Sequence, residues 1–141
     1  MLTLSYGLKG KNIIVTGAAG GLGSSVAKSF AASGANLLLT DIDLKKKTLN
    51  SLSKSLNKKY NIKCHILLLD ISNRDDVSAN LEISINGFTK KIDCLVNCAA
   101  IYHKNFWEPL GTKNIEGWDK IIDINLFGTL NIIRQVLPKM I

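Results

Sequence analysis

Proline, cysteine and long apolar runs are scarce in this sequence. Its 141 residues include two prolines and three cysteines, and 21% of them are charged. A chain so poor in proline and charge, and 46% hydrophobic, can build a core and is not disordered. No apolar run approaches the roughly 20 residues that cross a bilayer, so we expect no membrane contact.

The cysteines and the N-terminus exclude further classes of protein. Cys64, Cys94 and Cys98 are odd in number and lack the spacing of a zinc site, which favours reduced thiols and no bound metal. The first eleven residues lack the apolar stretch and small-residue cleavage site of a secretory signal. These absences predict a cytoplasmic protein.

The net charge of +7 raises the question of nucleic-acid binding. Many lysines fall between residues 45 and 59, mostly on the polar side of one predicted helix. Aromatic residues that would stack on bases are not interleaved with them, which favours a solvated helix face and no nucleic-acid partner. The nucleic-acid alternative predicts an affinity that falls steeply with salt.

What the sequence does contain is an alternation of apolar strands with amphipathic helices. Short apolar, mostly β-branched or leucine-rich segments predict strands over residues 12–16, 36–40, 65–69 and 92–96. Apolar residues at helical spacing predict helices over 22–33, 44–56, 75–85 and 114–137, with an irregular stretch over 101–113. This order predicts one α/β domain over residues 1–141, a doubly wound parallel sheet with helices on both faces, which ends after the fourth strand and its following helix.

The segment from Thr16 to Gly23 is glycine-rich and lies between a predicted strand and a predicted helix. Glycines there let the backbone turn sharply and approach a pyrophosphate, which the free N–H groups of the next helix can bind. An ordinary tight turn is the alternative. The context favours dinucleotide binding, with the pyrophosphate held by Gly17, Gly21, Leu22 and Gly23.

Asp41 ends the second predicted strand. A carboxylate there can accept hydrogen bonds from both ribose hydroxyls of an adenosine and would repel a 2′-phosphate. Ala18, Ala19 and Gly20 offer no basic side chain for such a phosphate. We therefore predict NAD rather than NADP as the cofactor. The alternative is a solvated acid, or a cap for the helix that follows.

The spacing T-G-x-x-x-G-x-G of residues 16–23 resembles that of the short-chain dehydrogenase/reductase family, which has a Rossmann-like, NAD(P)-binding fold. Four further segments match that family in order: Asp70-Ile71-Ser72, Asn97-Cys98-Ala99-Ala100, Trp118-Asp119 and Asn125-Leu126-Phe127-Gly128. The resemblance implies that Asp70 and Ile71 meet the adenine. It also implies that the cofactor's nicotinamide side is lined by Asn97, Ala99 and Ala100.

The same resemblance makes Asn125 the first member of the family's catalytic set. The family also needs a Ser and a Tyr-x-x-x-Lys pair for hydride transfer between NAD(P) and a carbonyl or secondary alcohol. The residues four positions after Tyr6, Tyr60 and Tyr102 are Gly10, Cys64 and Phe106, so none of the three qualifies. We therefore expect an incomplete domain without its catalytic half, inactive by itself and part of a longer oxidoreductase.

Other readings of the chain remain open at this point. A truncated protein that binds NAD or a partner chain without catalysis is the main alternative. A sugar-nucleotide epimerase or dehydratase is disfavoured, because those extended relatives usually show T-G-x-x-G-x-x-G. The resemblance further implies a homo-oligomer, a dimer or tetramer, that forms through the long helix around residues 114–141. An unpartnered fourth strand and helix would also make the chain alone poorly soluble or oligomeric.

Overall fold

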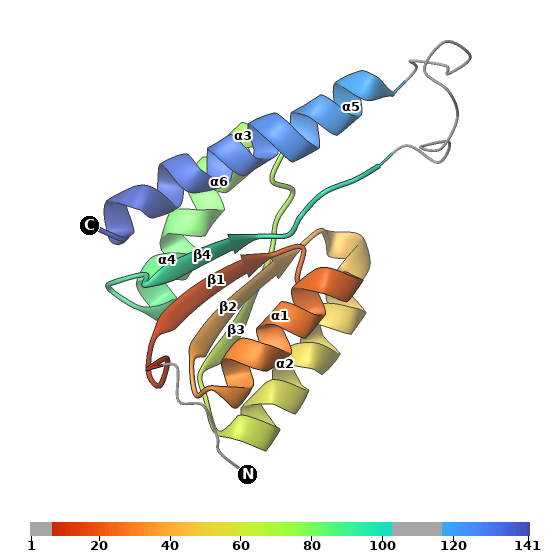
Figure 1. The fold of residues 1–141 in the computed structure, drawn as a ribbon. Coiled ribbons are helices and arrows are strands. Elements are labelled where there is room, and N and C mark those ends of the chain that lie inside the picture. The colour runs from red at the N-terminus through yellow and green to blue at the C-terminus, as the bar shows by residue number, and fades with distance from the viewer. Residues whose placement is uncertain (1–6, 103–116) are drawn as a thin grey trace.

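The computed structural model describes residues 7–102 and 117–141, and its centre is a parallel sheet (Figure 1). The sheet contains β1 (Asn12–Thr16), β2 (Asn36–Asp41), β3 (Cys64–Leu68) and β4 (Cys94–Asn97). All the neighbouring pairs are parallel, in the order β3-β2-β1-β4. This topology confirms the predicted parallel α/β sheet.

Helices cover both faces of the sheet (Figure 1). One face carries α1 (Gly21–Ala32), the short 3-10 turn η1 (Asp43–Lys45) and α2 (Lys46–Tyr60). The other face carries two longer helical segments, each interrupted by a π-helical stretch. The first runs through α3 (Arg74–Asp76), η2 (Val77–Leu81) and α4 (Glu82–Phe88). The second runs through α5 (Trp118–Ile122), η4 (Asp123–Gly128) and α6 (Thr129–Val136), followed by the 3-10 turn η5 (Leu137–Lys139).

Each sheet face has its own apolar core. Ile13 and Val15 of β1 face α1 and α2, whereas Ile14 between them faces α4 and α6. All three are fully buried. Because strands covered on both faces bury every residue, they have the continuous apolar sequence that identified them.

The strand boundaries differ from the predicted ones at β3 and β4. The predicted start of the fourth strand, at residue 92, was wrong, because β4 begins at Cys94. The N–H of Ile92 instead donates to the Lys139 carbonyl (2.9 Å). Ile92 is fully buried rather than open at the edge, although β4 is the edge strand. The third strand is shifted by one residue, since Leu69 donates to the Asp41 carbonyl (2.9 Å) after β3 has ended.

The long C-terminal helix is confirmed where the structure describes it. Its predicted first turn, with Asn114 as cap, and most of the predicted irregular stretch lie outside the described residues. Gly117, with a φ of 88°, precedes α5. Within residues 7–102 and 117–141, no helix combines the length and apolarity that a membrane span requires.

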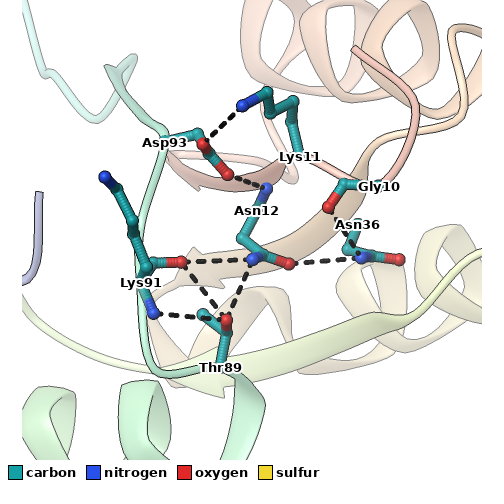
Figure 2. Close-up of polar contacts among 7 residues, drawn as sticks. All are labelled: Gly10, Lys11, Asn12, Asn36, Thr89, Lys91 and Asp93. Atoms are coloured by element: carbon teal, nitrogen blue, oxygen red, sulfur yellow. Dashed lines mark hydrogen bonds and ion pairs between the residues drawn. The ribbon is translucent and has the colours of Figure 1, made fainter.

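A polar network joins the strands at the end of the sheet where they begin (Figure 2). The side-chain amide of Asn12 donates to the Thr89 hydroxyl (2.9 Å) and the Lys91 carbonyl (3.1 Å), and its oxygen accepts from Asn36 (3.2 Å). Asp93 accepts from the Asn12 backbone N–H (2.9 Å). The network therefore ties β1 and β2 to the segment that leads into β4.

Neutralising Asp93 is expected to destabilise the protein in a pH-dependent way. The Asn12 N–H, followed by the Lys11 ammonium at 3.0 Å, lowers the pKa of Asp93 below its ordinary value. A lowered folded-state pKa contributes stability above the unfolded pKa, and that stability is lost as pH falls through the folded pKa. Asp93→Asn should lower the free energy of unfolding by about 1 kcal/mol at neutral pH, and should not change it once the wild-type carboxyl is protonated.

Chemical denaturation at pH 7, and at a pH low enough to protonate Asp93 in the folded wild type, tests this expectation. Lys11→Met is the control, because it removes the ion pair and leaves the stronger Asn12 bond in place. It should therefore cost less than Asp93→Asn. A difference between wild type and Asp93→Asn that stayed constant over this pH range would contradict the assignment.

Candidate functional site

A cavity of about 360 Å³ opens at the edge of the sheet where the strands end. The segments that follow all four strands line it, together with residues of α5 and η4. Six of the predicted cofactor residues are among its lining residues: Gly17, Asp41, Asp70, Ile71, Ala99 and Ala100. The carboxyl edge of a parallel sheet is where doubly wound proteins bind their ligands.

Gly17 brings the loop after β1 against the segment after β4. Its φ is 62°, and a Cβ built there would lie 2.7 Å from both the N and the Cα of Ala99. A side chain therefore fits neither the backbone conformation nor the space. The Thr16 hydroxyl holds the same contact from the next residue, because it accepts from the N–H groups of Cys98 (3.1 Å) and Ala99 (3.2 Å).

The N-terminus of α1 follows this loop, and its first N–H groups have no hydrogen-bond partner among the described residues. Gly20 occupies the cap position and provides no side-chain hydrogen bond, and Ser24 is the first helix residue that donates within it, to the Gly20 carbonyl (2.9 Å). The N–H groups of residues 21–23 precede the first intrahelical donor, at the positive end of the helix dipole. Such an end is suited to an anionic group such as a pyrophosphate.

Asp41, the last residue of β2, and Asp70, two residues after β3, lie on the cavity wall. The Asp41 carboxylate accepts from the backbone N–H groups of Ala19 and Ile42, both at 2.9 Å. Asp70 accepts from the Ser72 N–H (3.0 Å) and hydroxyl (2.7 Å), a local turn that directs the chain away from the strand. Both acids therefore organise backbone around the cavity, and Ile71 beside Asp70 is buried.

Asn97 does not line the cavity. It is the last residue of β4, opposite Thr16, and its side chain is exposed. Cys98, the next residue, lines the cavity instead. Burial raises the pKa of the Cys98 thiol above its ordinary value, which disfavours the reactive thiolate.

Asn125 lies behind the cavity wall, within the π-helical segment η4. Its amide oxygen accepts from the Ile101 N–H and its amide nitrogen donates to the Ile101 carbonyl, both at 2.8 Å. The side chain thus fixes Ile101, which lines the cavity together with Ile124 and Lys120. Gly21, Leu22 and Gly23 also stand outside the lining residues.

Two lysines on the wall were not predicted as site residues. Lys45 was assigned to the solvated face of a helix, and Lys120 was not singled out. The position of Lys45, one turn after a strand-end acid, is the signal that would have identified it. Within the described part of the chain, no group of three or more His, Cys, Asp or Glu residues is arranged to hold a metal ion.

Comparisons with known proteins agree with this geometry. A family model described as short chain dehydrogenase matches residues 11–141. Human 3-hydroxyacyl-CoA dehydrogenase type-2 is 32% identical over 136 residues, which are 94% of this chain and 49% of that protein. Rabbit (Oryctolagus cuniculus) L-fucose dehydrogenase is 30% identical over 131 residues, 93% of this chain and 43% of that protein.

Solved structures share the fold. L-sorbose reductase of Gluconobacter frateurii, solved with NADPH and L-sorbose, superposes with a TM-score of 0.84 at 23% identity, over 97% of this chain and 50% of that one. A short-chain dehydrogenase/reductase of Brucella melitensis has a TM-score of 0.78 at 32% identity, over 94% of this chain and 51% of that one. The chain thus spans about half the length of these relatives. Because the family model covers nearly all of it, the chain belongs to the short-chain dehydrogenase family.

Proposed function

We propose that the full-length protein is an oxidoreductase that transfers a hydride between NAD and a carbonyl or secondary alcohol. The observation that carries this proposal is the pairing of an uncapped helix N-terminus with a cavity at the carboxyl edge of the sheet. The free N–H groups of residues 21–23 would hold the pyrophosphate, and Gly17 lets the loop that precedes them pack directly against the backbone of Ala99. NAD supplies the hydride acceptor or donor.

One buried polar atom also fits a bound group in this cavity. The Thr40 hydroxyl is fully buried at a residue that lines the cavity, and it has no hydrogen-bond partner among the described residues. Buried hydroxyls without a partner are costly, so a ligand or a water that reaches this one is favoured.

The remaining cofactor contacts follow from the positions of the wall residues. Asp41 would bind the adenosine ribose, Asp70 and Ile71 the adenine, and Ala99 and Ala100 the nicotinamide side. Asn97 is exposed and would contribute through the end of β4 rather than through its side chain. Asn125 would act on the reaction from behind the wall, through the Ile101 backbone that it holds.

NAD is favoured over NADP because the Asp41 carboxylate would repel a 2′-phosphate. Lys45 and Lys120 lie on the same wall, and their positive charges would attract a 2′-phosphate. They therefore reduce the preference for NAD. Binding of both nucleotides should therefore be measured rather than that of NAD alone.

A carboxylate placed at the start of α1 tests the proposed function. A side chain at Gly21 meets open space, so Gly21→Asp should fold normally and compete with the pyrophosphate for the helix N-terminus. We expect saturable NAD binding by the full-length wild type, measured by calorimetry, and an affinity lower by about tenfold or more in Gly21→Asp. Gly87→Asp in α4, also in open space, is the matched control and should bind like wild type. Wild-type protein that binds neither NAD nor NADP would refute the proposal.

Self-association through the C-terminal helical segment is the second part of the proposal. Its outer face exposes a row of apolar side chains at helical spacing: Trp118, Ile122, Leu126, Leu130, Ile133 and Leu137. An exposed apolar row of this size marks an interaction surface. We assign it to a homo-oligomer interface, and the loss of the oligomer in Leu126→Lys, measured by sedimentation, tests the assignment.

All three cysteines are free, which agrees with a reducing compartment such as the cytoplasm.

The 141 residues contain no Tyr-x-x-x-Lys, so the proton transfer that accompanies hydride transfer is assigned to residues outside them. The 141-residue chain alone should therefore not turn over substrate.

A further inference from the structure

The Asp41 carboxylate makes one contact that ribose recognition does not require. Its Oδ2 accepts a hydrogen bond from the Ala19 N–H at 2.9 Å, across 22 positions of sequence. Its Oδ1 accepts from the adjacent Ile42 N–H, also at 2.9 Å. A strand-end side chain on β2 is thereby bonded to the middle of the glycine-rich loop after β1.

The Ala19 bond completes a series that fixes the loop. The Ala18 N–H donates to the Thr40 carbonyl (3.0 Å) and the Gly20 N–H donates to the Gly17 carbonyl (3.0 Å). Ala19 lies between them, and its N–H is the only one of the three with a side-chain acceptor. Bonds to a carboxylate are stronger than bonds between neutral groups. The next three residues of the chain carry the free N–H groups at the start of α1.

Asp70 shows that an acid on the cavity wall does not by itself make this contact. It lies two residues after the end of β3 and lines the same cavity, yet among the described residues its carboxylate accepts only within its own turn, from Ser72. The loop after β1 therefore depends on Asp41 and not on acids at this edge in general.

We propose that Asp41 is a positioning residue of the glycine-rich loop in addition to its role at the ribose. The proposal rests on the proposed function, because the loop is taken as the pyrophosphate site. Each carboxylate oxygen has a second lone pair, so the bond to Ala19 and a bond to a ribose hydroxyl are compatible. Removal of the side chain should therefore weaken binding of NAD and NADP together, and not merely change the preference between them.

Hydrogen exchange of the nucleotide-free, full-length protein tests the loop contact directly. In Asp41→Ala, the peptide that contains Ala19 should exchange about tenfold faster than in wild type. Asp41→Asn keeps an oxygen that can accept from the Ala19 N–H, and the exposed Ile42 N–H can bond to water instead. Exchange of the peptide that contains Ala19 should therefore stay near wild type in this variant. Asp43→Asn, an equal change of charge at an exposed residue outside the cavity, is the matched control. Equal exchange in wild type and Asp41→Ala would overturn the proposal.

Nucleotide titration of the same variants tests the consequence of the side chain's contacts for binding. Asp41→Asn should bind NADP at least as tightly as wild type, because the loop is held and the repelling charge is gone. Asp41→Ala should bind both nucleotides about tenfold more weakly than Asp41→Asn. Equal affinities in the two variants would overturn the positioning role. Wild type without affinity for either nucleotide would refute the proposed function instead, and would leave the exchange result intact.

Discussion

Replacing Gly23 with alanine is expected to disrupt the junction of the loop with α1 and to abolish nucleotide binding. Gly23 is buried in the first turn of α1. A Cβ there would overlap the Gly17 carbonyl oxygen and would lie 2.8 Å from the Gly17 carbonyl carbon and 2.9 Å from the Ala18 Cα. These are backbone atoms, so no side chain can move to relieve the overlap. We expect a loss of about 2–4 kcal/mol in the free energy of unfolding.

Gly21→Ala is the matched control for this experiment. Gly21 lies in the same helical turn, but a Cβ there meets nothing within 4 Å. Alanine is the better helix former, so this variant should be at least as stable as wild type. Urea denaturation of the three full-length proteins, followed by NAD titration, makes the comparison. Equal stability of Gly23→Ala and Gly21→Ala would show that the loop can shift to accept a side chain.

The architecture was predictable because the buried strands have a recognisable, continuous apolar sequence. β1 and β2 are buried on both faces, which requires uninterrupted apolar residues such as Ile13, Ile14 and Val15. The glycine-rich loop was predictable for a related reason. A Cβ at Gly17 or Gly23 would overlap backbone atoms of neighbouring segments, so only glycine fits at these two positions. The spacing of the glycines in the sequence therefore reflects the geometry of the loop.

The direction of individual side chains was less predictable. Asn97 was expected on the cofactor side, but it is the last residue of β4 and is exposed, whereas Cys98 one position later lines the cavity. Successive strand residues face opposite ways, and whether a residue reaches the site depends on where the strand stops. After β4 ends at Asn97, the N–H groups of Cys98 and Ala99 donate to the Thr16 hydroxyl instead of continuing the strand pairing.

Contacts between distant segments were not visible in the sequence at all. The pattern predicted Asp41 as a ribose ligand but not its bond to Ala19. It predicted a helix after β2 but not that Lys45, in the 3-10 turn before α2, lines the cavity. Hydrogen-bond partners depend on the packed arrangement of the elements, which a periodicity argument does not resolve.

The second large effect is expected at Asn125. Its amide forms two hydrogen bonds of 2.8 Å with the backbone of Ile101, and both groups are partly buried. Asn125→Ala would leave the N–H and the carbonyl of Ile101 without these partners, at a cost of about 2–4 kcal/mol. Because Ile101 lines the cavity, NAD binding should weaken in parallel.

Asn131→Ala on the same helical segment is the control, since the Asn131 side chain makes one hydrogen bond to the described part of the chain, to the Ile71 carbonyl at 3.1 Å. Urea denaturation of the full-length proteins should show a smaller loss for this variant than for Asn125→Ala. Asn125→Asp should not rescue the loss, because it keeps the acceptor for the Ile101 N–H but places a carboxylate oxygen against the Ile101 carbonyl. If Asn125→Ala lowered the rate of hydride transfer while stability and NAD affinity were unchanged, Asn125 would act on the reaction directly. A parallel loss of the rate, the stability and the NAD affinity would show that Asn125 acts through the two hydrogen bonds that hold the Ile101 backbone.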